Sequence, residues 1–310
     1  MHVLVTGGAG FIGSHVTRVL LQQGHQVTVV DNLCRGYRHL VHPEARFVQA
    51  DLADQEAVEG ALRGQDAVVH MAGFIAVGES VERPVLFAEN NVVNSLRLLE
   101  GMRQTGVSRM VFSSSACVYG VPQRLPIREE DPLGVQSNPY GASKIAVESY
   151  LGTYHQLYGF DCVILRYFNC YGPNELHDPE THAIPIFIRA ALERRPIPLY
   201  WKGEQVRDFI YVEDLARAHA EVLRLSGFHY FNVGSDIGTK VIDVVRAIFD
   251  ILGYEVPIED LGERPGDVPA TYASSRKISE ALGWRPQVSL EEGLRRTVEF
   301  YRALGAPKQA

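Results

Sequence analysis

A tyrosine and a lysine stand four residues apart, as Tyr140 and Lys144, at the start of an expected helix. Side chains at that spacing share one face of a helix. A phenol with a pKa of about 10 is a poor base at neutral pH, but a neighbouring ammonium and a cationic nicotinamide ring would favour the phenolate. The pair therefore predicts a proton-transfer site with Tyr140 as the base. A surface tyrosine packed on a lysine stem is the structural alternative.

Three serines follow the apolar pair Val111-Phe112 at the end of an expected strand. Ligands of open α/β sheets bind beyond the carboxyl ends of the strands, which is where this hydroxyl cluster falls. Ser115 could donate to, or accept from, a substrate hydroxyl beside Tyr140, so we include it in the catalytic group. Ser113 and Ser114 are explained equally well as a polar turn after a strand.

A glycine-rich loop follows the first expected strand and opens a helix. Gly8, Gly10 and Gly13 satisfy the pattern G-x-G-x-x-G, and Gly7 extends it to G-x-x-G-x-x-G. Such glycines let the backbone approach a diphosphate closely, and the N–H groups of the helix N-terminus then bind the anion. The loop predicts a dinucleotide site, with an ordinary glycine-rich turn as the alternative.

Asp31 ends the second expected strand. A carboxylate there accepts hydrogen bonds from the adenosine ribose and repels a 2′-phosphate, which favours NAD over NADP. Arg35 and Arg38 follow closely and could serve a 2′-phosphate, but we interpret them as solvated loop charges. Asp51, after the third strand, suits either the adenine amino group or a cap for a helix at 53–63.

The first half of the chain supplies the elements that must position these groups. Short β-branched runs predict strands at 2–6, 26–30, 45–49, 67–70, 109–113 and 161–165. The segments between them predict helices at 11–23, 55–62, 85–104 and 139–157. Apolar strands that alternate with helices indicate a parallel sheet covered on both faces. The predicted fold class is α/β, with a doubly wound, Rossmann-like parallel sheet.

Beyond about residue 170 the sequence becomes rich in turns and prolines. Helices are expected there at 183–194, 212–225, 239–252 and 289–304, joined by short strands. We therefore expect a dinucleotide-binding domain at 1–170, completed by part of 209–235. A second, smaller α/β substrate domain is expected at 171–310, interleaved with the first.

Composition argues against several other classes of protein. A formal net charge of −7 disfavours a nucleic-acid partner, because such binding needs a concentrated basic surface. No apolar run approaches the roughly 20 residues that cross a bilayer, so no membrane partner is expected. Four cysteines without a C-x-x-C pair indicate reduced thiols. The first strand is expected at residues 2–6, and this segment does not resemble a secretory leader. We therefore expect a cytoplasmic protein.

Taken together, these motifs resemble the extended short-chain dehydrogenase/reductase superfamily and, within it, the UDP-galactose (UDP-glucose) 4-epimerases. The resemblance covers nearly the whole chain. Besides the motifs above, it is carried by the segments His70-Met71-Ala72-Gly73, 76–80, 90–92, 165–169, 207–212, 264–267 and 282–284.

The resemblance implies an NAD-dependent isomerase that inverts the C4 hydroxyl of a UDP-hexose through a 4-keto intermediate. Its catalytic residues would be Tyr140, Lys144 and Ser115. The implied NAD contacts are Gly7, Gly10, Phe11, Ile12, Asp31, Asn32, Asp51, Leu52, Ala72, Gly73, Asn91, Tyr140, Lys144 and Phe168. The implied UDP-hexose contacts are Ser115, Tyr140, Asn169, Pro198, Tyr200, Arg207, Arg264, Asp267 and Thr271.

Substrate breadth depends on Thr271 in this resemblance. The family's bulky tyrosine at that position excludes an N-acetyl group, whereas threonine leaves room for one, unless the neighbouring Tyr272 fills the space. The resemblance also implies a homodimer formed through the aliphatic face of the helix at 85–105, which includes Val92, Val93, Leu96 and Leu99. Core packing explains that face equally well.

Some positions depart from the family pattern. Ile75 stands where some members carry lysine, and Trp201-Lys202-Gly203 replaces the usual glycine-rich turn. Ala116 and Cys117 occupy the positions at which the related 4,6-dehydratases carry an Asp-Glu acid pair, which disfavours dehydration. A UDP-glucuronate epimerase, a reductase and a non-catalytic NAD-binding regulator remain alternatives.

Potential metal ligands also gather at residues 175–182, as Glu175, His177, Asp178, Glu180 and His182. Their spacing matches no common zinc template. We therefore interpret the segment as a polar loop and expect no metal.

Overall fold

Seven parallel strands form the central sheet of the computed structural model, which describes residues 1–177, 182–263 and 268–305. Their order is β11-β6-β5-β4-β1-β2-β3. The bounds are β1 (His2–Thr6), β2 (Gln26–Asp31), β3 (Arg46–Gln49), β4 (Ala67–His70), β5 (Arg109–Ser115), β6 (Asp161–Tyr167) and β11 (Phe228–Val233). The sheet confirms the predicted Rossmann-like α/β fold.

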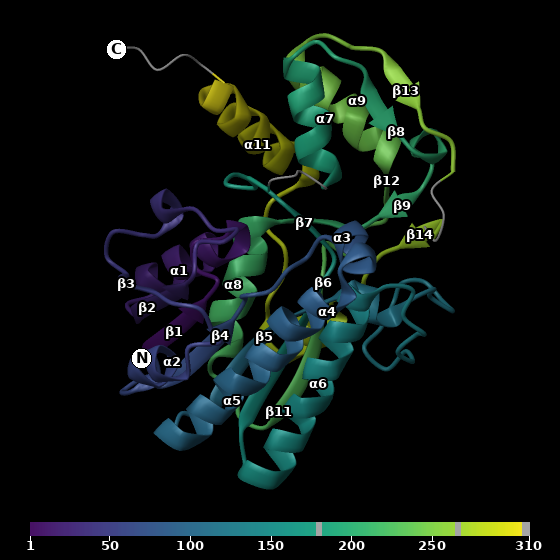
Figure 1. The fold of residues 1–310 in the computed structure, drawn as a ribbon. Helices are drawn as coiled ribbons and strands as arrows, with labels where there is room; N and C mark the ends of the chain where they lie inside the picture. Colours follow the sequence, from purple (N-terminus) through teal and green to yellow (C-terminus); the bar gives the residue numbers. More distant parts are fainter. Residues whose placement is uncertain (178–181, 264–267, 306–310) are drawn as a thin grey trace, which may run out of the picture.

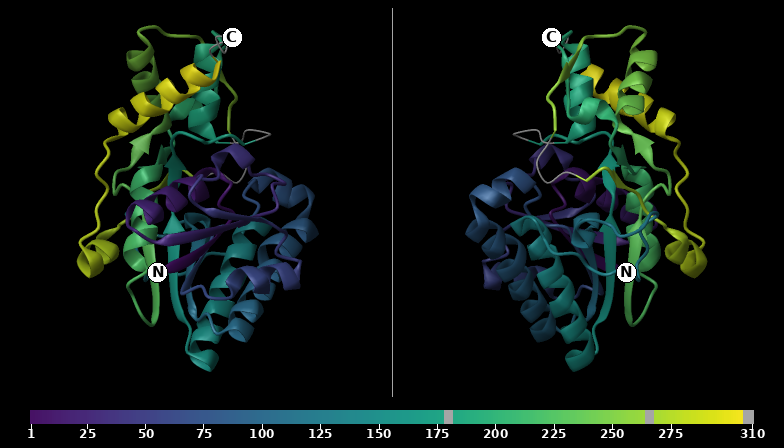
Figure 2. Two further views of the ribbon diagram at one scale, coloured as in Figure 1. Left: turned by 90° about the vertical axis from the view of Figure 1, so that its left-hand side faces the viewer. Right: turned by 90° about the vertical axis from the view of Figure 1, so that its right-hand side faces the viewer.

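Helices cover both faces of this sheet (Figures 1 and 2). On one face lie α1 (Phe11–Gln22) and α8 (Val212–Val222); on the other lie α2 (Gln55–Leu62), α5 (Asn94–Thr105) and α6 (Pro139–Tyr158). Successive side chains of a strand point to opposite faces. In β1, Val3 and Val5 therefore pack in the core under α1 and α8, whereas Leu4 packs in the core under α2, α5 and α6. The two cores explain why the strands are apolar without interruption.

The strand order reverses beside β1, which lies between β4 and β2. The connections that leave the carboxyl ends of β1 and β4 therefore run to opposite faces of the sheet. A crevice opens at such a reversal, and ligands of doubly wound sheets bind there.

A smaller unit lies beyond the carboxyl ends of the strands (Figure 1). Its core is formed by α7 (Ala183–Leu192), α9 (Val241–Leu252) and α11 (Leu290–Gly305). Three small sheets lie outside the large one: β7 (Asn169–Tyr171) with β10 (Phe209–Tyr211), β8 (Ile197–Leu199) with β13 (Ile258–Asp260), and β9 (Val206–Arg207) between β12 (Thr239–Lys240) and β14 (Ala270–Thr271). The boundary at residue 170 stays a prediction, although α8 and β11 both pack with the large sheet.

The helix expected at 85–104 is continuous but not uniform. It begins as α4 (Pro84–Phe87), passes through a wider π-helical turn at Ala88–Val93 and continues as α5. Leu99 is fully buried in the core, so its expected place on a dimer face is wrong. No described helix is long and apolar enough to span a bilayer.

Two short helices were not expected from the sequence, namely α3 (Val77–Glu82) and α10 (Arg276–Leu282). Each buries a single side chain, Ser80 in α3 and Ile278 in α10. Neither helix therefore shows the repeat of apolar residues that predicts an amphipathic helix.

Candidate active site

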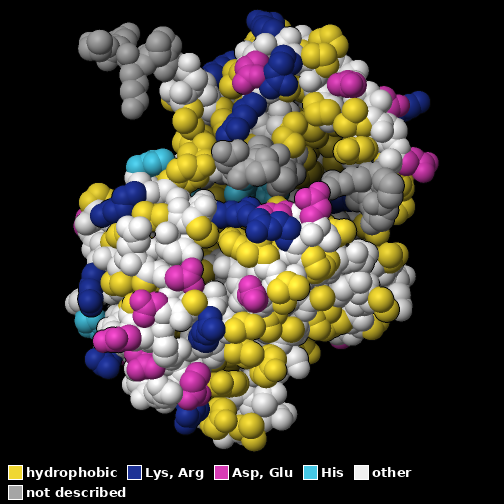
Figure 3. Space-filling view, viewed as in Figure 1, with side chains coloured by type: hydrophobic (Ala, Val, Ile, Leu, Met, Phe, Trp, Pro, Cys, Tyr) yellow, Lys and Arg dark blue, Asp and Glu magenta, His cyan; other side chains and the backbone are white. Residues whose placement is uncertain are grey.

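A cavity of about 1220 Å³ lies between the carboxyl ends of the strands and the smaller unit. Figure 3 shows the molecule hollowed at this level. Most of the predicted site residues line it: Gly7, Gly10, Phe11, Ile12, Asp31, Asn32, Asp51, Leu52, Ala72, Gly73, Ser115, Tyr140, Lys144, Phe168, Asn169, Pro198, Tyr200, Arg207 and Thr271. Arg264 and Asp267 lie outside the described residues.

Asn91 is not at the cavity surface but behind it. Its buried amide accepts a hydrogen bond from the Phe74 N–H at 2.8 Å and donates to the Phe74 carbonyl at 2.9 Å. A third bond joins it to the Ser143 hydroxyl on α6 at 3.1 Å. Asn91 therefore braces the loop after β4 against α6, and any effect on a ligand passes through that loop.

The glycine loop is packed too closely for larger side chains. A Cβ atom on Gly13 would lie 2.2 Å from the Gly7 carbonyl oxygen, and one on Gly7 would lie 2.7 Å from the Ala72 nitrogen. Gly7 also has a left-handed backbone with φ of +70°, which glycine adopts at little cost. The loop thus brings the N-terminus of α1 to the floor of the cavity, in the arrangement that binds a diphosphate.

Asp31 is held rigidly at the end of β2. Its carboxylate accepts hydrogen bonds from the Ala9 N–H at 3.0 Å and the Leu33 N–H at 2.8 Å. Burial raises the pKa of this carboxyl, and the two N–H donors oppose that shift. The side chain is therefore fixed at the position where an adenosine ribose would be recognised.

Asp51 does not cap the following helix, so that alternative is wrong. The cap is Asp54, which accepts from the Ala57 N–H at 3.1 Å. Asp51 instead accepts from the Asn32 side-chain amide at 2.7 Å and from the Ala53 N–H at 2.8 Å. Asn32 and Asp51 thus form a polar pair on the cavity wall.

Arg35 is more than a solvated loop charge. It donates to both carboxylate oxygens of Glu79 at 2.7 Å each, and its guanidinium lies 4.5 Å from the centre of the Phe74 ring. Arg38 lies over the ring of Phe47, also at 4.5 Å. One guanidinium nitrogen of Arg35, Nη2, makes both bonds, and this ion pair with Glu79 engages Arg35 at the rim of the cavity.

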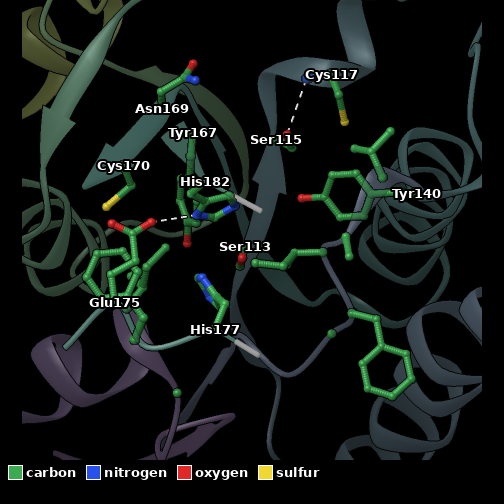
Figure 4. A pocket seen from close by; sticks show the side chains of 18 of the residues that line it. Ser113, Ser115, Cys117, Tyr140, Tyr167, Asn169, Cys170, Glu175, His177 and His182 are labelled. Carbon is green, nitrogen blue, oxygen red and sulfur yellow. Dashed lines mark hydrogen bonds and ion pairs between the residues drawn. The ribbon is translucent and has the colours of Figure 1, made fainter. Parts of the chain in front are cut away.

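The proton-transfer group comes from β5 and α6. Asn138 caps α6 by accepting from the Gly141 N–H at 2.8 Å, which fixes the first turn that carries Tyr140. Ser115 lies beside the Tyr140 side chain in Figure 4, and its hydroxyl accepts a hydrogen bond from the Cys117 N–H at 3.3 Å. The Lys144 ammonium lies 5.8 Å from the centre of the Tyr140 ring.

Burial is the main influence on the pKa values of Tyr140 and Lys144. It raises the pKa of Tyr140 well above its ordinary value, with the neighbouring Ser115 hydroxyl acting in the opposite direction. It also lowers the pKa of Lys144 to about 8. Desolvation therefore outweighs the neighbouring ammonium, which does not by itself draw the phenol toward neutral pH. The positive charge of a nicotinamide ring is needed as well.

A buried polar network supports β5 and α6 from behind. The Glu148 carboxylate accepts from the Ser114 hydroxyl at 2.5 Å and from Arg166 at 2.7 and 3.1 Å. Arg166 also donates to the Tyr119 hydroxyl at 2.9 Å, and Tyr119 donates to Asn232 at 2.6 Å. Sequence reasoning missed this network, although the spacing of Glu148 four residues after Lys144 placed it on the same helix face.

The opposite wall carries the residues expected to bind the nucleotide sugar. β9 and β14 run parallel, and Arg207 is the register partner of Thr271. Arg207 is anchored by a hydrogen bond to the Val206 carbonyl at 2.8 Å. Asn169 follows at the start of β7, where its N–H bonds the Asp208 carbonyl at 2.9 Å. A cation, an amide and a small hydroxyl thus face the catalytic group across the cavity.

Two further residues at the cavity bear on whether this site could catalyse a dehydration. Ala116 and Cys117 line it directly after Ser115. Burial raises the pKa of the Cys117 thiol to about 11, so the thiol stays protonated at neutral pH. Ala116 has no proton to give, and a thiol with so high a pKa is a much weaker acid than the carboxyl groups of the dehydratases.

Comparison with known proteins agrees with this geometry. The model of the NAD dependent epimerase/dehydratase family matches residues 3–234. A UDP-glucose 4-epimerase from Streptococcus mutans is 39% identical over 308 residues, which cover 93% of this chain and 92% of the relative. The crystal structure of a Thermotoga maritima UDP-glucose 4-epimerase with UDP-glucose superposes with a TM-score of 0.94 at 36% identity, covering 98% of this chain and 99% of the other.

A structural relative with an acetylated substrate matches equally well. A UDP-N-acetylglucosamine 4-epimerase from Methanobrevibacter ruminantium, in complex with UDP-N-acetylmuramic acid, has a TM-score of 0.93 and 33% identity. It covers 98% of both chains.

Proposed function

Because this chain belongs to the NAD dependent epimerase/dehydratase family, we propose that it inverts the C4 hydroxyl of UDP-glucose or UDP-galactose through a 4-keto intermediate. One observation carries this proposal: Tyr140, Lys144 and Ser115 line the same cavity as Arg207. The arrangement pairs an acid-base group with an anion-binding cation, as a nucleotide-sugar oxidation requires.

The residues around the glycine loop fit NAD. The tightly packed glycines keep the N-terminus of α1 accessible to the diphosphate. The fixed Asp31 carboxylate suits the adenosine ribose. Asn32, Asp51 and Lys144 would hold the rest of the dinucleotide. When bound, NAD supplies a hydride acceptor for C4 and a donor for the opposite face of the ketone.

The side chains of this site move the proton. Tyr140 takes the proton of the C4 hydroxyl during oxidation and returns one during reduction. Ser115, beside Tyr140, positions the sugar hydroxyl. Lys144 contributes positive charge beside the phenol while its ammonium is protonated. Oxidation followed by reduction from the other face inverts C4 without net redox change.

The substrate is retained by groups away from the reacting carbon. The fixed fork of the Arg207 guanidinium suits the oxygens of the diphosphate, and Arg264 and Asp267 are proposed as further contacts on the resemblance alone. The 4-ketose can then turn while the nucleotide stays bound. Remote binding energy of this kind keeps an intermediate in place.

N-acetylated substrates are part of the proposal. Thr271 lines the cavity beside Arg207, where its short side chain leaves more space than a tyrosine ring. The structural relative from Methanobrevibacter ruminantium is an epimerase of UDP-N-acetylglucosamine, which supports the wider specificity.

We also propose that the chain works in the cytoplasm as a homodimer. Exposed apolar side chains gather on α3, α4 and α6 and on the turn before α5, in the lower half of Figure 3. They are Val81, Val85, Val93, Tyr150, Leu157 and Tyr158. A second copy packed on this surface would remove them from water.

Mass spectrometry of the purified chain, followed by an assay, tests the function. Denaturation should release NAD, and the intact protein should convert UDP-galactose to UDP-glucose without added cofactor. Absorbance at the NADH band should show no net change during turnover. Net NADH formation would indicate a dehydrogenase, and NAD without turnover of any UDP-sugar would indicate a regulator.

A further inference from the structure

Three side chains with metal-binding atoms meet in the loop between β7 and α7. The carboxylate of Glu175 and the imidazoles of His177 and His182 each place one such atom within 4.8 Å of the other two. Figure 4 shows them side by side, across the cavity from Tyr140. In the described ranges of the chain this is the one group of its kind.

The chemistry of the three atoms selects a class of ion. Two imidazole nitrogens and one carboxylate oxygen are the donors that zinc takes in sites with an open fourth position. Magnesium and calcium prefer shells made of oxygen. All three side chains line the cavity, so a bound ion would be reached from it.

Neighbouring elements hold the ligands in place. Glu175 is fully buried, and its main-chain carbonyl accepts a hydrogen bond from the Tyr301 hydroxyl on α11. His182 directly precedes α7. The ring of His177 packs edge-on against that of His182 at 4.7 Å and against Phe11 of α1 at 6.3 Å. The site is therefore supported from three helices.

The charges of the group also favour a cation. The Glu175 carboxylate lies 2.6 Å from Nδ1 of His182. A buried carboxylate is stabilised by positive charge beside it. A divalent ion bound by the group would supply such charge. Metal ions compete with protons for imidazole nitrogens, so the affinity of such a site rises with pH.

We propose that Glu175, His177 and His182 form a binding site for a divalent ion of the zinc class on the cavity wall. The local sequence is then a Glu-x-His-x₄-His ligand set, a spacing outside the common zinc templates. The site is separate from the proton-transfer group, and it does not depend on the proposed epimerisation.

Zinc uptake by the untagged full-length chain tests the site. The protein is stripped with a chelator, dialysed and titrated with zinc against a chromophoric chelator at pH 6, 7 and 8. Metal content after gel filtration is measured by mass spectrometry. Variants His177→Ala, His182→Ala and Glu175→Gln are compared with His39→Ala, which removes an exposed histidine that does not line the cavity. Far-ultraviolet circular dichroism checks that each variant is folded.

The wild type and His39→Ala should bind one zinc ion per chain, more tightly at pH 8 than at pH 6. Loss of one ligand should weaken zinc binding by about 100-fold or more. Loss of a residue that only hydrogen-bonds a ligand typically weakens metal binding by about 10–100-fold. The proposal fails if the wild type binds no zinc. It also fails if folded His177→Ala and His182→Ala bind zinc as the control does, because the ion would then lie elsewhere.

Discussion

The ammonium of Lys144 donates a hydrogen bond to the main-chain carbonyl of Ser113 at 2.8 Å. This bond ties α6 to the end of β5, two residues before Ser115. The helix that carries Tyr140 and the strand that carries Ser115 are therefore held in one arrangement before any ligand binds. Lys144 thus has a structural role in addition to its charge.

Removal of the Tyr140 hydroxyl should abolish most of the activity. Tyr140→Phe leaves the ring in place but removes the acid-base group, so kcat should fall by about 10²–10⁴. Retention of NAD should be unchanged, as measured by the nucleotide that the denatured protein releases. Tyr150→Phe on the same helix, with an exposed ring, should keep full activity. Near-normal turnover by Tyr140→Phe would exclude this residue as the base.

Activity should decline on the alkaline side of pH 8. Burial lowers the pKa of Lys144 to about 8, so the ammonium is present below that pH and is lost above it. The neutral amine no longer stabilises a phenolate at Tyr140, and kcat should fall between about pH 8 and 9.5. The profile is measured at saturating UDP-galactose, with samples returned to pH 7 to exclude inactivation. A constant kcat across this range contradicts the role given to the ammonium.

Asp31→Ala should weaken NAD binding and admit NADP. The variant removes the carboxylate that we assign to the ribose and leaves two N–H groups, of Ala9 and Leu33, without their acceptor. A hydrogen bond to a charged group contributes about 1.5–3 kcal/mol, which corresponds to roughly 10–100-fold in affinity. Titration of the nucleotide-free protein with NAD and NADP measures both effects. Asp66→Ala, remote from the cavity, is the control, and NADP bound to the purified wild type would refute the assignment.

Thr271→Tyr should narrow the substrate range. The ring would occupy space beside Arg207, so turnover of UDP-N-acetylglucosamine should be lost and turnover of UDP-glucose retained. Initial rates on both substrates measure the change. Tyr272→Ala, which removes the neighbouring ring, should leave the ratio of the two rates unaltered if Tyr272 does not fill the pocket. A wild type inactive on the acetylated sugar would show that Thr271 does not open the site.

Glu148→Gln should destabilise the fold and lower activity together. It leaves the Arg166 guanidinium buried without its carboxylate, and breaking a buried pair in this way costs about 3–5 kcal/mol. Urea unfolding measures the loss. Glu100→Gln, which breaks the exposed pair with Arg103, should have little effect. An equally small effect of Glu148→Gln would mean that the network does not support β5.

Local patterns predicted most of the framework and of the proton-transfer group. The glycine loop, Asp31 and the pair Tyr140 and Lys144 each lie within one short connection or one helix turn, where spacing alone determines proximity. The π-helical turn before α5 was not predictable, because its residues still read as an ordinary helix.

Features that depend on distant parts of the chain were missed or wrong. Burial of Tyr140 arises from several elements at once, so its raised pKa could not be read from the spacing to Lys144. The contact between Glu148 and Arg166 joins α6 to β6 and is invisible to a local pattern. Glu175, His177 and His182 were dismissed on spacing, although the loop brings them together.

The position of β11 at one end of the sheet has a consequence for biosynthesis. β6 is complete at residue 167, but its neighbour β11 ends only at residue 233. A nascent chain of intermediate length therefore presents β6 as an open edge, and unpaired strand edges template aggregation. Fragments that stop before residue 228 should need chaperone protection, and the two halves of the enzyme cannot be expressed as independent pieces by a cut between β6 and β11.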